Sequence, residues 1–310
     1  VLQIRAGARD ITEKSYYTSD LKNVTNNLFV HPLRSISEEG WTKFMSQEIL
    51  PGAYGTGDSR WGPNYTLHLL GGGMTYRALW EWFDDHKLPV PWLWSATTVL
   101  GYELMNEALE NKGATGRNTD AIADFWFFNV GGIVLFSFPS VSRFFSKTVI
   151  MSDWSLQPSF TYPRFDLHNH GQYFSFKYPL PFYEKLRLFS WLGMAQLFGL
   201  SYKMDSGYSV TAAGGTMDTR FVNETGNSVH NSVQFRPSGA IFIDRNESLL
   251  ASLQVSNIKD YFALLNLYPN AFWKTNPGLG FWGVTDKEGH FIVGLSLSTI
   301  GLGAGFGSLK

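Results

Sequence analysis

The sequence has no cysteine among its 310 residues. A disulfide scaffold, thiolate metal sites and cysteine nucleophiles are therefore excluded. Charge is also scarce, because Asp, Glu, Lys and Arg make up 16% of the chain, against roughly 25% in an ordinary soluble domain. The formal net charge is −1. Since a nucleic-acid binder needs a basic face, we do not expect nucleic acid as a partner.

Long hydrophobic runs are also absent from the sequence. No run of about 20 apolar residues occurs, which argues against a standard transmembrane helix. The nearest case, residues 125–138, is short and contains Asn129 and two glycines, so it fits a buried or interfacial helix better. The first residues also lack the apolar segment and cleavage site of a signal peptide. We expect that an exported form of this protein has already lost its signal peptide.

Aromatic residues are abundant and make up 16% of the chain, and glycine is abundant as well, with 31 residues. Residues 1–62 are expected to be irregular, apart from a short helix that Ser37 would cap. Residues 63–150 are expected to be helical, in three segments at about 65–86, 92–110 and 119–137. The first segment contains Gly71, Gly72 and Gly73. Glycines in a helix interior indicate close approach to a neighbouring helix.

After about Met151 the hydrophobic pattern changes to the period of two that is typical of strands. Eight to ten strands, separated by turn residues, are the size of a small closed barrel. Aromatic residues lie near many strand ends, as in the girdles of membrane barrels. The sequence therefore predicts an α+β fold, in which an N-terminal helical region precedes a membrane-embedded antiparallel β-barrel at 151–310. A soluble β-sandwich or lipocalin-like barrel remains the alternative.

Several polar residues interrupt the apolar helices. His68 lies in the first segment, Glu103 and Glu107 lie one turn apart in the second, and Asp120, Asp124 and Asn129 lie in the third. A buried carboxylate is costly unless it is paired or hydrogen-bonded. The three helices are therefore expected to share one polar cluster.

The spacing of these residues forms a pattern. Its members are Asn64, His68, Gly71, Gly72, Gly101, Glu103, Glu107, Asp120, Asp124, Asn129, Gly131 and Gly132. The pattern resembles uncharacterised bacterial envelope families, which include periplasmic lipoproteins and outer-membrane proteins of unknown function. Some of those families carry a β-rich segment after the helices. The resemblance implies an envelope location, and no catalytic residues come with it.

Two functions follow as expectations. The first is an outer-membrane protein with a structural or interaction role, which docks membrane lipid or an envelope protein partner through its helical region. The polar cluster would then fix the packing of the helices. The alternative is a membrane-surface hydrolase or acyltransferase that acts on lipid. His68 would be its general base, Glu103 or Asp120 would orient the imidazole, and Asn129 or a backbone amide would stabilise an oxyanion. Water would attack, alone or with the help of a metal held by histidine and carboxylate ligands. No cofactor is expected for either function.

A second candidate site lies in the β-rich half. Asp166, His168 and His170 alternate along the sequence, which places them on one face of a strand. Such a group has the residue types and the spacing of metal ligands. A solvated loop is the alternative interpretation.

Overall fold

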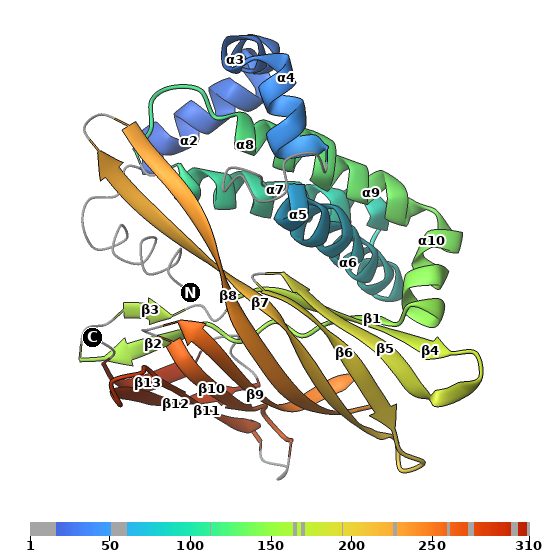
Figure 1. Cartoon of the computed structure of the whole chain (residues 1–310). Helices are drawn as coiled ribbons and strands as arrows, with labels where there is room; N and C mark the ends of the chain where they lie inside the picture. Colours follow the sequence, from blue (N-terminus) through green and yellow to red (C-terminus); the bar gives the residue numbers. More distant parts are fainter. Residues whose placement is uncertain are drawn as a thin grey trace. The chain divides into compact units, whose positions relative to one another are not determined.

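The computed structural model describes residues 17–50, 61–111, 113–163, 166–168, 171–193, 195–225, 228–258, 261–271, 276–298 and 303–308. At 61, 166–168, 218–225 and 228–235 it describes the backbone only. The chain divides into two compact units, which meet in sequence at Phe144 and Phe145. The first unit is helical and the second is a sheet (Figure 1). The predicted α+β class, with the helices first, is confirmed.

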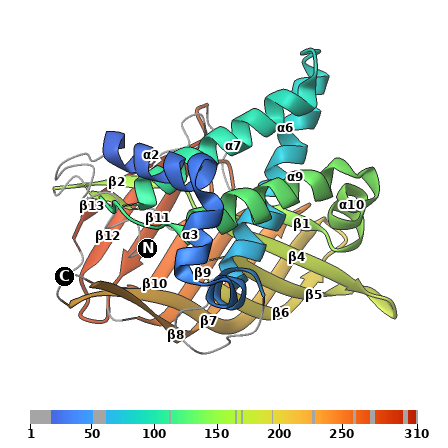
Figure 2. The ribbon, with the colours of Figure 1, turned by 90° about the horizontal axis from the view of Figure 1, so that it is seen from above.

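The helical unit consists of α-helices and of shorter stretches, labelled η, that have the wider turn of a π-helix. They are α2 (Tyr17–Thr25), η1 (Asn26–Val30), α3 (Pro32–Glu39), α4 (Trp41–Phe44), η2 (Met45–Ile49), α5 (Trp61–Pro63), η3 (Asn64–Gly72), α6 (Gly73–Asp85), α7 (Pro91–Glu110), α8 (Thr119–Ile122), η4 (Ala123–Asn129), α9 (Val130–Ser137) and α10 (Pro139–Arg143). A last stretch, η5 (Phe144–Thr148), joins the two units in sequence. Figure 2 shows α6 and α7 meeting at one tip of this unit.

The segment before residue 62 differs from the prediction. It is helical over most of its described part, and Ser37 lies inside α3 instead of capping a helix. The helix starts earlier because Pro32 occupies its first turn, where proline is favoured, and it ends at Gly40, whose φ is +102°. Val24 and Leu28, one helical turn apart, pack in the same apolar core as Ile122. Burial of this apolar face explains why the segment is ordered as helices.

Glycines allow two helices of this unit to touch. A Cβ atom on Gly132, in α9, would collide with the backbone carbonyl oxygen of Leu69, and one on Gly73 would lie 2.8 Å from the carbonyl oxygen of Gly132. No residue larger than glycine fits such a contact without a backbone shift. The close helix approach predicted from the glycine run is confirmed.

One helical run could cross a membrane by length and composition. It comprises α8, η4 and α9, residues Thr119–Ser137, and half of its most apolar window is buried inside the protein. It also carries Asp120, Asp124 and Asn129.

The described part of the second unit is a sheet of thirteen strands. They are β1 (Met151–Asp153), β2 (Ser159–Tyr162), β3 (Asp166–His168), β4 (Tyr173–Leu180), β5 (Tyr183–Gly193), β6 (Ala195–Lys203), β7 (Tyr208–Thr225), β8 (Ser228–Arg245), β9 (Ser248–Ile258), β10 (Tyr261–Leu267), β11 (Leu279–Thr285), β12 (Phe291–Leu297) and β13 (Gly303–Gly307). Strands β4 to β13 pair in chain order and antiparallel, with β4 to β8 drawn side by side in Figure 1.

The sheet is not closed into a barrel, and it has more strands than the predicted eight to ten. Its order starts at β1 and ends at β3, and β13 pairs with β2 in parallel. The reason lies in the segment that contains β1 and β2. Its first part pairs with β4, and the backbone N–H of Trp154 continues that pairing to Tyr173 O. Its later part turns to β13, where Pro158 O accepts from Gly303 N. β4 and β13, the first and last strands of the antiparallel series, therefore pair with different parts of this one segment. They do not pair with each other.

One face of the sheet is apolar and exposed. Residues paired across successive strands form an unbroken row on this face, which we call the apolar row. From β4 to β2 it contains Tyr178, Leu188, Leu200, Ala212, Ile241, Leu253, Leu265, Gly283, Val293, Phe306 and Tyr162. Its large side chains are between 42% and 62% exposed.

The opposite face is buried and carries polar and charged groups among its aromatic residues. Lys177 Nζ lies 2.6 Å from Asp244 Oδ2 and 2.8 Å from Glu247 Oε2, and Arg187 Nη1 lies 2.6 Å from Glu247 Oε1. Lys177 and Asp244 are fully buried. The buried face also holds a hydrophobic core that includes Phe189, Trp191 and Phe242. The exposed face is thus the unusual one, because it is apolar where the exposed face of a soluble sheet is polar.

The close helix contact can be tested with two Gly→Ala variants. Gly132→Ala should lower the free energy of unfolding by about 1–3 kcal/mol, because the methyl group meets backbone that cannot move away. Gly101→Ala is the matched control, since a Cβ at this position in α7 meets nothing within 4 Å. The control should be neutral or stabilising by up to about 1 kcal/mol, from helix propensity. Denaturant unfolding of both variants, followed by tryptophan fluorescence, measures the difference. Equal effects would refute the contact.

A candidate histidine–carboxylate site in the helical unit

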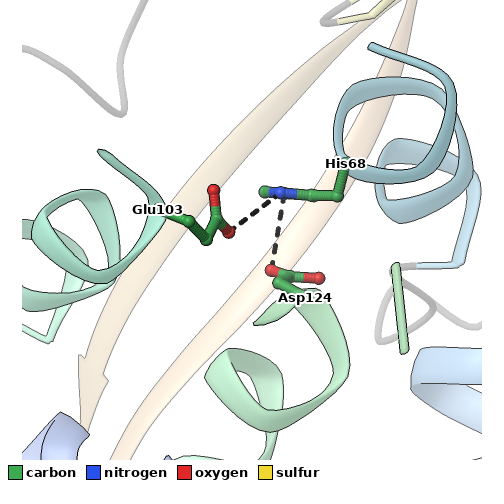
Figure 3. A group of neighbouring side chains, drawn as sticks. All are labelled: His68, Glu103 and Asp124. Carbon is green, nitrogen blue, oxygen red and sulfur yellow. Dashed lines mark ion pairs between the residues drawn. The ribbon is translucent and has the colours of Figure 1, made fainter. Parts of the chain in front are cut away.

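Three helices of the helical unit bring one polar side chain each to a common point. His68 comes from η3, Glu103 from α7 and Asp124 from η4. Figure 3 shows the three side chains pointing toward one another. The polar cluster predicted for these helices is therefore present, with His68 at its centre.

The imidazole of His68 lies between two carboxylates. Its Nδ1 is 3.0 Å from Glu103 Oε1, and its Nε2 is 3.5 Å from Asp124 Oδ2. Asn129 adds an amide, whose Nδ2 is 3.1 Å from His68 Nδ1 and also donates to the backbone oxygen of Asp124 at 3.1 Å. The histidine is thus surrounded on both sides of its ring by groups that fix its orientation.

The local backbone around the site is π-helical. His68 and Asp124 lie on η3 and η4, which pack against each other. π-Helical turns are rare and are frequent at functional sites. Gly72 permits the contact, because a Cβ there would collide with Asn129 Oδ1. The sequence pattern showed the glycine but gave no signal for the wider turns.

The carboxyl groups of the site are buried. Glu103 is 4% exposed and Asp124 is 5% exposed, whereas the His68 side chain keeps 16% of its surface. Burial raises the pKa of Asp124 well above its usual range; the charge of His68 opposes this shift and that of Asp120 adds to it. Burial lowers the pKa of His68, but the charges of Asp124 and Glu103 outweigh it and raise this pKa to about 10. The metal-free site therefore holds an imidazolium at neutral pH.

One buried oxygen of the site has no partner. Asp124 Oδ1, which points away from the histidine ring, makes no hydrogen bond, whereas Glu103 Oε1 lies 3.0 Å from His68 Nδ1. Buried polar atoms in folded proteins nearly always have a partner. The cluster is therefore incomplete on the side of Asp124 that faces away from the histidine.

The remaining predicted residues lie around this centre. Glu107 is buried one turn after Glu103, and burial, reinforced by the charge of Asp124, raises its pKa well above the usual value. Asp120 is partly exposed, and its charge acts on both Glu107 and Asp124. Of the six candidates, His68, Glu103, Asp124 and Asn129 come together directly.

Sequence reasoning missed Glu48 as part of this environment. It is 3% exposed at the end of the segment expected to be irregular, and its charge acts on Asp124. Its backbone oxygen accepts from Asn64 Nδ2 at 3.4 Å. The position of Glu48 beside Ile49 and Leu50 is the signal that could have indicated a buried carboxylate.

A second polar network, also missed, joins α2 to the end of α7. Asp20 Oδ1 accepts from Asn111 Nδ2 at 2.9 Å and from the backbone N–H of Gly113 at 2.8 Å. Asn27 adds its amide, whose Nδ2 donates to Gly116 O at 3.1 Å. These bonds satisfy the groups involved, so the network acts as a structural clamp.

The other predicted site falls largely outside the described residues. Asp166 and His168 belong to β3, of which the backbone alone is described, and His170 lies outside the described residues. The metal site predicted from these three residues stays a prediction.

Comparison of the chain with protein-family models, with curated proteins and with solved structures gives no match. The chemistry of the site therefore has to be argued from its own geometry. A single imidazole between buried carboxylates can hold a proton, lock three helices together, or supply ligands to a cation.

The raised pKa of His68 predicts how stability depends on pH. With a pKa of about 10 in the folded protein against 6.5 ordinarily, His68 contributes stability that is complete below pH 6.5 and is lost as pH rises toward 10. The raised pKa of Asp124 acts in the same direction. Unfolding midpoints of chelator-treated protein between pH 6 and 10 should therefore fall with pH.

The matched variants are His68→Gln and His86→Gln. The first should flatten this dependence, whereas His86, exposed at the end of α6, should leave it unchanged when replaced. An identical slope in His68→Gln would show that His68 does not take up a proton on folding.

Proposed function

We propose that this chain is a component of a bacterial outer membrane with a structural or interaction role. Its sheet would lie in the bilayer with the apolar row against hydrocarbon. Its helical unit would dock membrane lipid or an envelope protein partner. The observation that carries the proposal is the exposed apolar row of the sheet.

The apolar row supports a hydrocarbon environment. An exposed apolar patch that crosses almost every strand of a sheet is far larger than soluble proteins usually leave in water. Charges such as Lys177 and Asp244 instead occupy the buried face. Membrane sheets have this distribution, with apolar residues toward lipid and polar residues toward the interior.

Backbone pairing has to satisfy the same environment. Open sheet edges do not occur in hydrocarbon, because unpaired N–H and C=O groups are too costly there. In this sheet β1 and β2 share one segment, which bonds to β4 with its first part and to β13 with its later part. This arrangement gives both flanks a backbone partner in one segment, although the sheet is not closed into a barrel.

Exposed tryptophans support a docking role for the helical unit. Trp82 on α6, and Trp92 and Trp94 at the start of α7, are each about half exposed. Tryptophan is enriched where a membrane meets water, because its ring is apolar and its N–H is polar. A lipid headgroup layer is the surface that such residues would contact.

The hydrolase alternative has less support. A general base must be unprotonated at the working pH, and the neighbouring carboxylates raise the pKa of His68 to about 10. The raised pKa of His68 therefore favours the structural role for the cluster when no metal is bound.

The location is tested by extraction and by one charge placed in the apolar row. Wild-type protein should stay with envelope membranes through salt and carbonate washes and should need detergent for release. Leu253→Arg should reduce the membrane-assembled fraction strongly, because an arginine facing hydrocarbon costs about 2–4 kcal/mol near the bilayer centre. Immunoblots of the washed fractions measure both effects.

Ser206→Arg is the control, since Ser206 is exposed in the turn between β6 and β7. It should behave as the wild type. Release of wild-type protein by carbonate, or equal behaviour of the two arginine variants, would end the proposal.

A further inference from the structure

We infer that His68, Glu103 and Asp124 form a binding site for one divalent first-row metal ion of the zinc type. The site is built from side chains of the helical unit alone. It does not depend on where the sheet resides, so its test and that of the proposed function are separate.

The spacing of the three side chains fits a metal ion. One nitrogen of His68 and one oxygen from each carboxylate all lie within 4.8 Å of one another. Bonds from zinc to nitrogen or oxygen measure about 2.0–2.2 Å, so two ligands of one ion are at most about twice that distance apart. A small side-chain adjustment brings all three into one coordination sphere.

The buried oxygen of Glu103 that faces the histidine fits a metal ligand. Glu103 Oε1 lies 3.0 Å from His68 Nδ1 and makes no other hydrogen bond. A metal ion held between Glu103, His68 and Asp124 would bond this oxygen directly.

The charges around the site favour a cation. Besides His68, the groups that act most strongly on Asp124 are the carboxylates of Asp120, Glu103 and Glu48. In the sheet, by contrast, the carboxylates of Asp244 and Glu247 are paired with the positive charges of Lys177 and Arg187. Among the described residues no lysine or arginine pairs with Asp124, whose ion-pair partner is His68. A divalent ion would supply further positive charge there.

Partial exposure also fits a metal site. His68 keeps 16% of its side-chain surface, which gives an ion a route to the ligands. One imidazole with two carboxylates suits Zn²⁺, Fe²⁺ or Mn²⁺ better than soft Cu⁺, which prefers sulfur.

The test uses the purified full chain in detergent. The protein is stripped with chelator, equilibrated with Zn²⁺, freed of loose metal by gel filtration, and analysed for zinc by mass spectrometry. We expect one zinc per chain and a higher unfolding temperature with the metal. Glu103→Gln and Asp124→Asn, which keep shape but lose charge, should each weaken binding at least ten-fold.

Glu81→Gln is the control, because Glu81 is an exposed carboxylate on α6 that pairs with Arg77. It should bind zinc as the wild type does. Zinc content at background in wild type, or equal content in Glu103→Gln and Glu81→Gln, would overturn the inference. Loss of zinc from His168→Ala with retention in Glu103→Gln would place the metal at 166–170 and would overturn it as well.

Co²⁺ provides a readout that does not depend on how the variants fold. In wild-type protein Co²⁺ should give visible absorption bands of a low-symmetry nitrogen–oxygen site, and added Zn²⁺ should abolish them. A spectrum identical to that of Co²⁺ in buffer would refute the site even if every variant failed to fold.

Discussion

The exposed apolar row is the constraint on which the rest of the sheet depends. Successive residues on a strand point to opposite faces, so the alternation that exposes Leu188 and Leu200 also buries Arg187 and Ser201. A charge buried in this way is tolerated only when it is paired. The ion pairs among Lys177, Asp244 and Glu247 are therefore a direct consequence of the exposed apolar row.

The helical unit solves a different packing problem. Its helices approach closely where glycines replace side chains, at Gly73 and Gly132, and this contact positions η3 against η4. The polar groups of His68 and Asp124 can meet because the backbones around them are already close. Packing and site chemistry are thus coupled, and a change that widens the helix contact would also separate the histidine from its carboxylate.

The sequence predicted the order of helices and strands and the residues of the polar cluster, because both follow from local periodicity. Glu103 and Glu107 lie one turn apart, and polar residues inside apolar helices have to find one another. Three features could not be read from it. The π-helical turns at η3 and η4 have no residue signature, and the helices before residue 62 depend on tertiary burial of residues such as Val24. The strand order could not be predicted from the sequence either, because β2 pairs with β13, which lies far away along the chain.

The pairing of β2 with β13 also restricts how the protein can fold during its synthesis. The partners Ser159 and Gly303 lie at nearly opposite ends of the sheet's sequence, so bringing them together costs much loop-closure entropy. Contacts of such long range slow folding. During synthesis β2 must wait for β13 to emerge, and its unpaired backbone is a template for wrong strands in the meantime. A chaperone that shields this segment until β13 has emerged would meet that need.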